Sequence, residues 1–463
     1  MAVLILPVAR AQQSAPTQSR PAGPLAPLPP DSGDQSGRST PTAIGTLSNT
    51  GARQSEPDTS FLSSVETFGL GSLYGLRRAF DPALYVSESR QTGLVAGRPL
   101  SASGVGGALN LDRQSGHYHL RITYNGSETI YEPSYYGLRY LPNHDAAISQ
   151  EISLGRWTLR LRDDVLYTWG SSFSGLFTGA PVLAGNEALS SMQPSLASGG
   201  TIQTGLARQL NNTASVEADY AFSRRTTAVF VGTYSLMHFL NSGYIDSQTI
   251  NGRLGYNYAL SAKNNIGLTY DYNLISFAGA SSRLQDDSVQ LAFGRKVTGR
   301  LAFQLAAGPQ LLAFQNFGPS KRRQLSWSAF SAITHQWHRT SYSLSYFRGV
   351  TAGSGVYTGT TSQTVTVAVN QEITKSWSAS VNSGYASNKA LLPVAGLAGQ
   401  FDDWFAGANL NRQIGPQVHL SVNYGYQRQT SQSGLCPVSS CGLQGTFSQV
   451  GVNLQWHPLA RGR

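Results

Sequence analysis

From residue 117 onward, apolar and polar residues alternate along the chain with a period of two. In the segment 118–124 the even positions are Tyr, Leu, Ile and Tyr, whereas the odd positions are His, Arg and Thr. The segments 365–370, 418–426 and 449–456 repeat this alternation. Because successive side chains of a strand point to opposite faces, the pattern predicts strands with one apolar and one polar face.

The predicted strands are joined alternately by tight turns and by longer links. The tight turns recur every 36 to 40 residues, with centres near Arg224, Ala262, Thr298, His338, Lys375 and Gly415. The longer links are rich in Gly, Ser, Asp and Asn and lie at 278–287, 314–322, 351–361, 387–402 and 431–443. One repeat therefore contains two strands, one tight turn and one longer loop.

This repeat discriminates between all-β architectures. A β-propeller blade packs four short strands into a similar length, and a parallel β-helix has much shorter rungs. A transmembrane β-barrel needs strands of about 9–11 residues with an apolar outer face and a polar inner face, joined by short turns on one side and longer loops on the other. The chain meets all three conditions, and we predict an antiparallel transmembrane barrel of about 16 strands, within a range of about 14–18.

Residues 117–457 resemble bacterial outer-membrane β-barrel proteins of the porin-like kind. The resemblance rests on the alternation, on the two classes of connection and on a closing strand at about 443–457 that carries Trp456 near its end. It names an architecture, because no family-specific motif is present. The resemblance implies that the chain lies in the outer membrane of a Gram-negative envelope, in contact with outer-membrane lipid, after insertion by the barrel-assembly machinery. It also implies transport of small hydrophilic solutes, and it is compatible with an oligomer.

The first 116 residues differ in composition from the rest. Residues 1–11 contain a short apolar run and end in Ala-Arg-Ala, the small-x-small form of a secretory cleavage site, so we expect the remainder of a signal peptide. Residues 12–59 are rich in Pro, Ser and Gln, which predicts disorder. Residues 60–116 are expected to form a plug or a short helix, although a strand-like stretch at 107–111 would fit a further pair of strands and a total of 18. The barrel is therefore placed at 117–463.

Composition and charge exclude several classes of protein. Of 463 residues, 34 are Lys or Arg and 24 are Asp or Glu, giving a net charge of +10. These charges are spread along the chain without a run of five, so nucleic-acid binding is not predicted. A helical membrane span is excluded as well, because the chain has no stretch of 18 consecutive apolar residues.

If the apolar faces contact lipid, the polar faces line the interior and form a mostly neutral, hydrated wall. The charged lumen candidates are Arg121, Arg160, Arg162, Asp164 and Arg253. As a basic patch, Arg121, Arg160 and Arg162 would give a diffusion pore a weak preference for anions. The favoured alternative is that these Arg side chains pair with Asp163, Asp164 or lipid headgroups and hold the wall together.

No catalytic or metal-binding constellation is predicted. The pairs Asp286-Asp287 and Asp402-Asp403 fall in the longer links and are interpreted as solvated loop charges. Adjacent residues on a strand would in any case point to opposite faces. Neither a Gly-x-Ser-x-Gly nor a His-Glu-x-x-His motif occurs, so we expect no enzyme, no metal site and no cofactor.

Cys436 and Cys441 are the one covalent feature that the sequence suggests. They lie in the last long loop, separated by four residues. In an exported protein, such a pair is expected to form a disulfide that staples the loop.

Three functions follow from these observations. The leading one is a passive channel for small hydrophilic solutes. In the second, residues 12–116 plug the lumen or dock the barrel to an envelope assembly or a polysaccharide export system. The third is a soluble extracellular β-protein that binds glycans.

Overall fold

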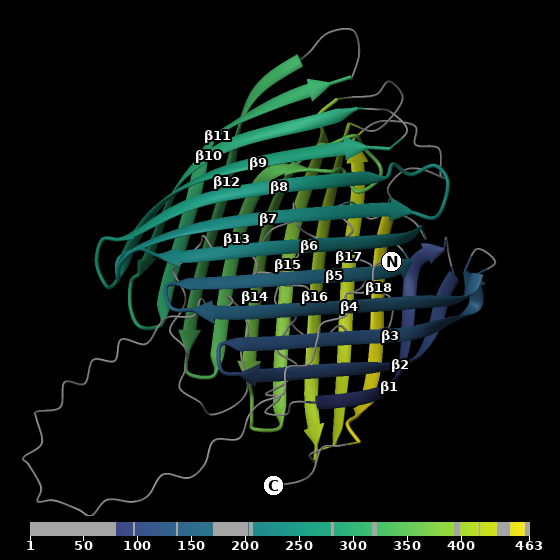
Figure 1. The fold of residues 1–463 in the computed structure, drawn as a ribbon. Coiled ribbons are helices and arrows are strands. Elements are labelled where there is room, and N and C mark those ends of the chain that lie inside the picture. Colours follow the sequence, from purple (N-terminus) through teal and green to yellow (C-terminus); the bar gives the residue numbers. More distant parts are fainter. Residues whose placement is uncertain are drawn as a thin grey trace, which may run out of the picture. The chain divides into compact units, whose positions relative to one another are not determined.

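The computed structural model describes residues 80–95, 98–135, 138–169, 202, 207–278, 282–316, 322–392, 399–415, 417–432 and 445–458. All of them belong to the compact unit Pro41–Arg463. They form one antiparallel sheet of 18 strands that closes on itself (Figure 1). Within the described residues, no helix is long and apolar enough to cross a membrane.

The strands run in chain order around the barrel. They are β1 (Phe80–Val95), β2 (Arg98–Ser115), β3 (Tyr118–Tyr135), β4 (Leu138–Leu154), β5 (Trp157–Trp169), β6 (Arg208–Ala221), β7 (Thr226–Phe239), β8 (Ser247–Ala259), β9 (Asn264–Phe277), β10 (Arg283–Lys296), β11 (Leu301–Gln315), β12 (Arg322–Trp337), β13 (Thr340–Thr351), β14 (Thr360–Glu372), β15 (Trp377–Ala390), β16 (Gln400–Ile414), β17 (Val418–Gln432) and β18 (Gly445–Trp456).

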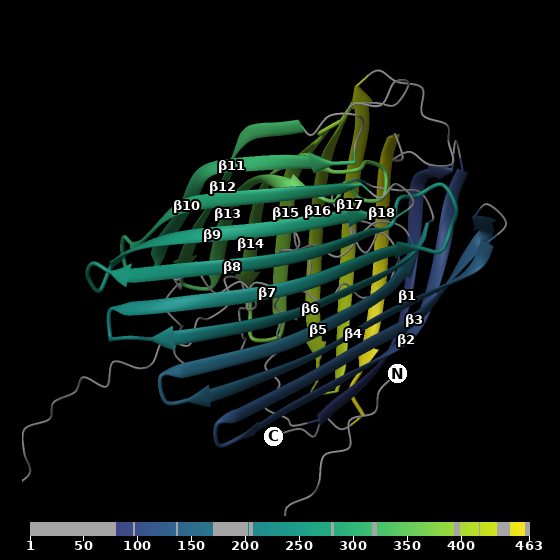
Figure 2. The same ribbon diagram turned by 45° about the horizontal axis from the view of Figure 1, so that its top comes forward.

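Each strand pairs antiparallel with its neighbours in the chain, and β1 pairs with β18 to close the barrel. The seam runs from the pair Leu84 and Trp456 to the pair Thr92 and Ser448. The early strands, purple to teal, and the late strands, green to yellow, form facing walls in both views (Figures 1 and 2). All-antiparallel closure confirms the coarser part of the predicted fold class, an all-β antiparallel closed barrel.

The barrel has 18 strands and not the central prediction of about 16, so it lies at the upper end of the predicted range, and the alternative of a further pair of strands before residue 117 is confirmed. The two additional strands, β1 and β2, lie in the segment 60–116 that was expected to form a plug or a short helix. The inner face of β2 is built mainly from Ala and Gly, which weakens the alternation that reveals a strand. These small residues are needed locally: a Cβ at Gly106 would collide with the ring of Tyr85, whose hydroxyl donates a hydrogen bond to Asn125 Oδ1 (2.6 Å).

The outer face of the barrel is apolar. Val367 is 45% exposed and Leu268 is 54% exposed, as are many other large apolar residues along the strands. Aromatic residues stand at the ends of this band, with Trp157 and Trp337 next to tight turns and Trp456 at the end of the last strand. Such a continuous exposed apolar surface, bordered by aromatic side chains, is the pattern of a lipid-facing barrel wall.

The connections fall into the two predicted classes. Tight turns at 222–225, 260–263, 297–300, 338–339 and 373–376, and turn conformations at Gly415 and residue 417, match the six predicted centres. The longer links are shorter than predicted, because the strands continue into them. The pairs Asp286-Asp287 and Asp402-Asp403 therefore lie on β10 and β16, and their interpretation as loop charges is wrong.

Several expectations fall outside the described residues. They concern the signal peptide at 1–11, the segment at 12–59, and the pair Cys436 and Cys441. These expectations remain predictions.

Candidate functional site

The inner wall is the candidate functional surface, because the polar faces of the strands converge there. Residues directly opposite each other in an antiparallel ladder share a face, so the register assigns the inner positions. On the later strands they are mainly amides, which include Asn382, Asn388, Asn409, Asn423, Gln427, Gln449 and Asn453. Asn388, Gln427 and Gln449 are almost fully buried.

Arg160 on β5 is the most heavily paired of the predicted lumen residues. Its side chain is 6% exposed and contacts Glu151 (3.3 Å), Glu217 (2.5 Å) and Asp219 (2.7 Å). The three carboxylates come from β4 and β6, the strands on either side of β5. The guanidinium therefore links three strands at a place where it is surrounded by opposite charge.

The other predicted lumen residues are also paired. Arg162 Nε contacts Asp164 Oδ2 at 2.6 Å, and Arg121 contacts Asp112 at 3.1 Å. Arg253 on β8 forms an ion pair with Asp271 on β9.

Asp163, the other acid considered as a partner for these Arg residues, lies elsewhere. It has the outward parity on β5 and accepts a hydrogen bond from Asn212.

The charge balance of the inner wall is negative. Inward-facing carboxylates on the described strands outnumber inward-facing Arg and Lys. The carboxylates are Asp81, Asp112, Asp145, Glu151, Asp164, Glu217, Asp219, Asp271, Asp286, Glu372 and Asp403. The bases are Arg121, Arg160, Arg162, Arg253 and Lys296. This balance is opposite to the one on which the expected weak anion preference was based.

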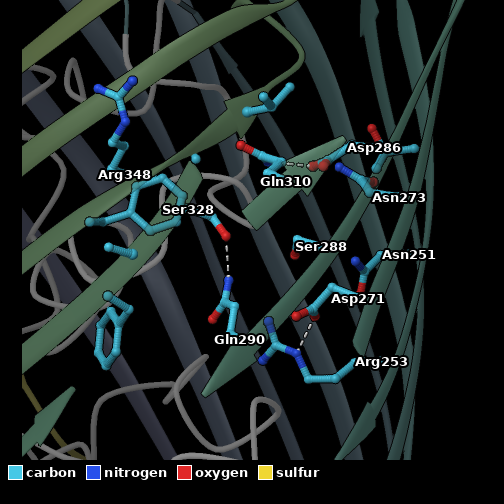
Figure 3. Close-up of a pocket in the computed structure, with 16 residues that line it drawn as sticks. Asn251, Arg253, Asp271, Asn273, Asp286, Ser288, Gln290, Gln310, Ser328 and Arg348 are labelled. Carbon is cyan, nitrogen blue, oxygen red and sulfur yellow. Dashed lines mark hydrogen bonds and ion pairs between the residues drawn. The ribbon is translucent and has the colours of Figure 1, made fainter. Parts of the chain in front are cut away.

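One sector of the inner wall, from β8 to β13, is hollowed into a recess that encloses about 690 Å³, including space open to solvent (Figure 3). Its first side is polar and includes Arg253, Asp271 and Asp286. Its other side includes Phe330 and Phe347, which lie opposite each other on β12 and β13.

The polar side of the recess is held in place by hydrogen bonds. Gln310 Nε2 donates to Asp286 Oδ2 at 2.8 Å, and Gln290 Nε2 donates to the Ser328 hydroxyl at 2.8 Å (Figure 3). Asp271 and Asp286 are each 8% exposed. The remaining carboxylate oxygens, Asp271 Oδ2 and Asp286 Oδ1, have no partner.

Sequence reasoning missed Asp286, although a signal was present. Residues 288–294 alternate between a polar or small face and an apolar face. Extending that parity by two residues toward the N-terminus places Asp286 inward and Asp287 outward. The composition of the preceding link, rich in Gly, Ser and Asp, obscured this continuation.

At the loop end, the inner wall changes from polar to apolar. Ile275, Phe277, Leu284, Leu312 and Phe314 form a buried cluster at the ends of β9, β10 and β11. Links pack against this end, contributing Ile245, Ala352 and Leu391.

The β13–β14 link is part of this apolar end. Val356 and Tyr357 pack with Phe401 of β16. Burial raises the pKa of Tyr357 to about 12, so its hydroxyl stays neutral at physiological pH. The ring can therefore remain in this apolar packing across the pH range of ordinary experiments.

Trp456 ends β18 and faces outward, opposite Leu84 and Val418, with 45% of its surface exposed. It belongs to the aromatic border of the barrel and not to the lumen. Among the described residues, no group of three or more His, Cys, Asp or Glu could hold a metal ion.

No family model and no curated protein matches the sequence. The fold is similar to OccK2 (OpdF) of Pseudomonas aeruginosa, with 9% identity, a TM-score of 0.43, and coverage of 82% of this chain and 98% of that one. It is also similar to the outer membrane protein OpdK of the same organism, at 10% identity and a TM-score of 0.40, covering 82% and 98% of the two chains. The FrpB iron transporter of Neisseria meningitidis matches at 9% identity and 0.40, with 81% and 67% covered. These values are too low to transfer a ligand or a family.

Proposed function

We propose that this chain is an integral outer-membrane β-barrel that acts as a passive channel for small hydrophilic solutes. The observation that carries the proposal is the inverted polarity of the closed sheet, which is apolar outside and polar inside. A closed barrel satisfies the backbone hydrogen bonds of all its strands, which a segment in lipid requires. The proposal includes secretion, insertion by the barrel-assembly machinery, and outer-membrane lipid as the surrounding phase.

The outer surface also argues against a soluble glycan-binding protein. Residues such as Val367, Leu268 and Leu291 would expose large side chains to water over the whole circumference. Soluble proteins rarely expose apolar patches of more than a few hundred Å². Extraction with and without detergent tests this point, since a soluble lectin would remain in the aqueous phase.

We further propose that the channel favours cations weakly. The excess of inward carboxylates, and the pairing of every predicted lumen Arg, leave the wall with net negative charge. Charged rings or walls of this kind select ions of opposite sign.

Planar-bilayer recording tests both parts of the proposal. The full-length protein, verified as folded by heat-modifiable migration on a mild detergent gel, is expected to show open single-channel currents. In a KCl gradient the reversal potential should have the sign of K⁺ preference. Folded protein without current would instead favour a plugged or docking barrel, and a potential of the opposite sign would reject the cation preference.

A further inference from the structure

We propose that the recess between β8 and β13 is a binding subsite for an organic ammonium ion, a protonated primary amine on a short hydrocarbon chain. The inference rests on the proposed function, because it concerns a solute within the lumen. It adds a defined chemical class of ligand and a defined place on the wall.

The first support is a pair of unused acceptors. Asp271 Oδ2 and Asp286 Oδ1 have no hydrogen-bond partner, although both residues are more than nine-tenths buried. An unsatisfied buried acceptor costs free energy until a donor reaches it. A carboxylate has no donor of its own when ionised, so the missing partner must supply N–H or O–H groups.

The second support is that these acceptors are held in position. The other oxygen of each carboxylate is bound by the protein: Arg253 pairs with Asp271, and Gln310 donates to Asp286 (2.8 Å). Asp286 and Asp271 lie on neighbouring strands as diagonal neighbours of the ladder, since Ser288 is directly opposite Asp271. Both carboxylates therefore border the same recess (Figure 3).

The third support is the charge of the recess. Arg253 offsets the charge of Asp271, and Asp286 is bound by a neutral amide. Arg348, the fourth charged residue of the lining, lies across the recess from both carboxylates, with its guanidinium carbon 4.4 Å from the centroid of the Trp327 ring (Figure 3). The charge beside the two carboxylates is therefore negative by one, which suits a monovalent cation.

The fourth support is the aromatic side of the recess. Phe330 and Phe347 lie opposite each other on β12 and β13 and line the same space. Aromatic rings attract cations and contact hydrocarbon favourably. A hydrated metal ion would gain little from these rings, whereas an alkylammonium ion would gain from both sides of the recess.

Isothermal titration of the full-length barrel in detergent with n-butylammonium chloride tests the proposal. Two probes separate its parts: tetramethylammonium keeps the charge but lacks N–H donors, and 1-butanol keeps the chain but lacks the charge. We expect butylammonium to bind at least about tenfold more tightly than either, because charge-assisted hydrogen bonds are the strongest contacts available. Equal affinity for either probe, or no binding of butylammonium, would overturn the proposal.

Asp286→Asn is the decisive variant, because it keeps the shape and removes the charge. It should weaken butylammonium binding about tenfold or more. Asp287→Asn is the matched control, because Asp287 faces outward on the same strand and contacts Tyr270 (2.7 Å). The affinity of this variant for butylammonium should equal that of the unaltered protein. Unaltered affinity of folded, heat-modifiable Asp286→Asn protein would show that the site lies elsewhere.

A second variant, Phe347→Leu, keeps the proposal testable if the Asp286→Asn protein fails to fold. It should lower the affinity for butylammonium several-fold and leave Asp286 intact, and an unchanged affinity would contradict the role of the rings. Bilayer conductance is measured separately. Current without butylammonium binding rejects the subsite alone, whereas binding without current rejects the channel and retains the subsite.

Discussion

At the scale of single residues, the arginines of the inner wall stabilise the barrel through ion pairs with carboxylates of the same or neighbouring strands. Arg160 is enclosed by Glu151, Glu217 and Asp219, and Glu217 is fully buried. Replacing Arg160 with Met should destabilise the barrel by about 3–5 kcal/mol, because it leaves buried carboxylates without their counter-charge. The urea midpoint of heat-modifiability in lipid vesicles measures this loss.

The control is Arg139, whose ion pair with Glu132 (2.9 Å) is exposed on both sides. Arg139→Met should change the stability by no more than about 1 kcal/mol, as is usual for surface pairs. Equal effects of the two substitutions would mean that the Arg160 cluster contributes no more than a surface pair.

Polarity at single positions provides a second test at this scale. Val367 lies near the middle of β14 on the outer face and is 45% exposed. Val367→Arg should cost about 2–4 kcal/mol in a bilayer if the position is at the midplane. Ala368→Arg, which projects inward, should cost clearly less. The same urea titration compares them, and equal costs would contradict the assignment of the lipid face.

At the scale of the elements, the two kinds of connection should face opposite sides of the membrane. Ser242 is exposed in the β7–β8 link, and Lys375 is exposed in the β14–β15 turn. In a background with Cys436 and Cys441 replaced by Ser, Ser242→Cys should react with an impermeant maleimide on intact cells. Lys375→Cys should react only after the outer membrane is permeabilised. The reverse result would invert the topology.

The β13–β14 link should limit conduction, because Val356 and Tyr357 pack into the apolar loop end with Phe401. Replacing residues 354–358 with a Gly-Ser linker of the same length should therefore raise the single-channel conductance. The same replacement in the exposed part of the β7–β8 link serves as the control and should leave the conductance unchanged. An unaltered conductance in the first variant would place the constriction elsewhere.

The elements also show how far sequence reasoning reaches. Strands such as β14, β17 and β18 were predictable because lipid on one side and polar residues on the other enforce a strict alternation. In the middle of β2 the inner positions, from Ala102 to Ala108, are only Ala and Gly, which allow Tyr85 to lie across Gly106 but weaken that alternation. The recess was not predictable, because it joins residues of β8 to β13 that only barrel curvature brings together.

At the scale of the whole molecule, the structure makes β1 the partner that closes the barrel. Thr92 Oγ1 lies 2.6 Å from Ser448 Oγ across the seam, so these two side chains share one face of the sheet. If residues 80–95 formed a plug or a helix, this contact would not exist. The proximity of residues 92 and 448 therefore reports whether β1 closes the barrel.

A cross-link across the seam tests this closure. In the background without Cys436 and Cys441, Thr92→Cys combined with Ser448→Cys should form a disulfide spontaneously on export, because directly opposite positions of a ladder have Cβ atoms about 4.5–5.5 Å apart, close to the spacing of about 3.5–4.5 Å in a disulfide. Thr92→Cys combined with Gln449→Cys is the control: a shift of one residue moves the second thiol to the inner face, so this pair should remain reduced. After boiling, the cross-linked chain should migrate faster without reductant than with it, since its two ends remain joined. Equal oxidation of both pairs would contradict the register of the seam, and oxidation of neither would show that residues 80–95 are not the closing strand.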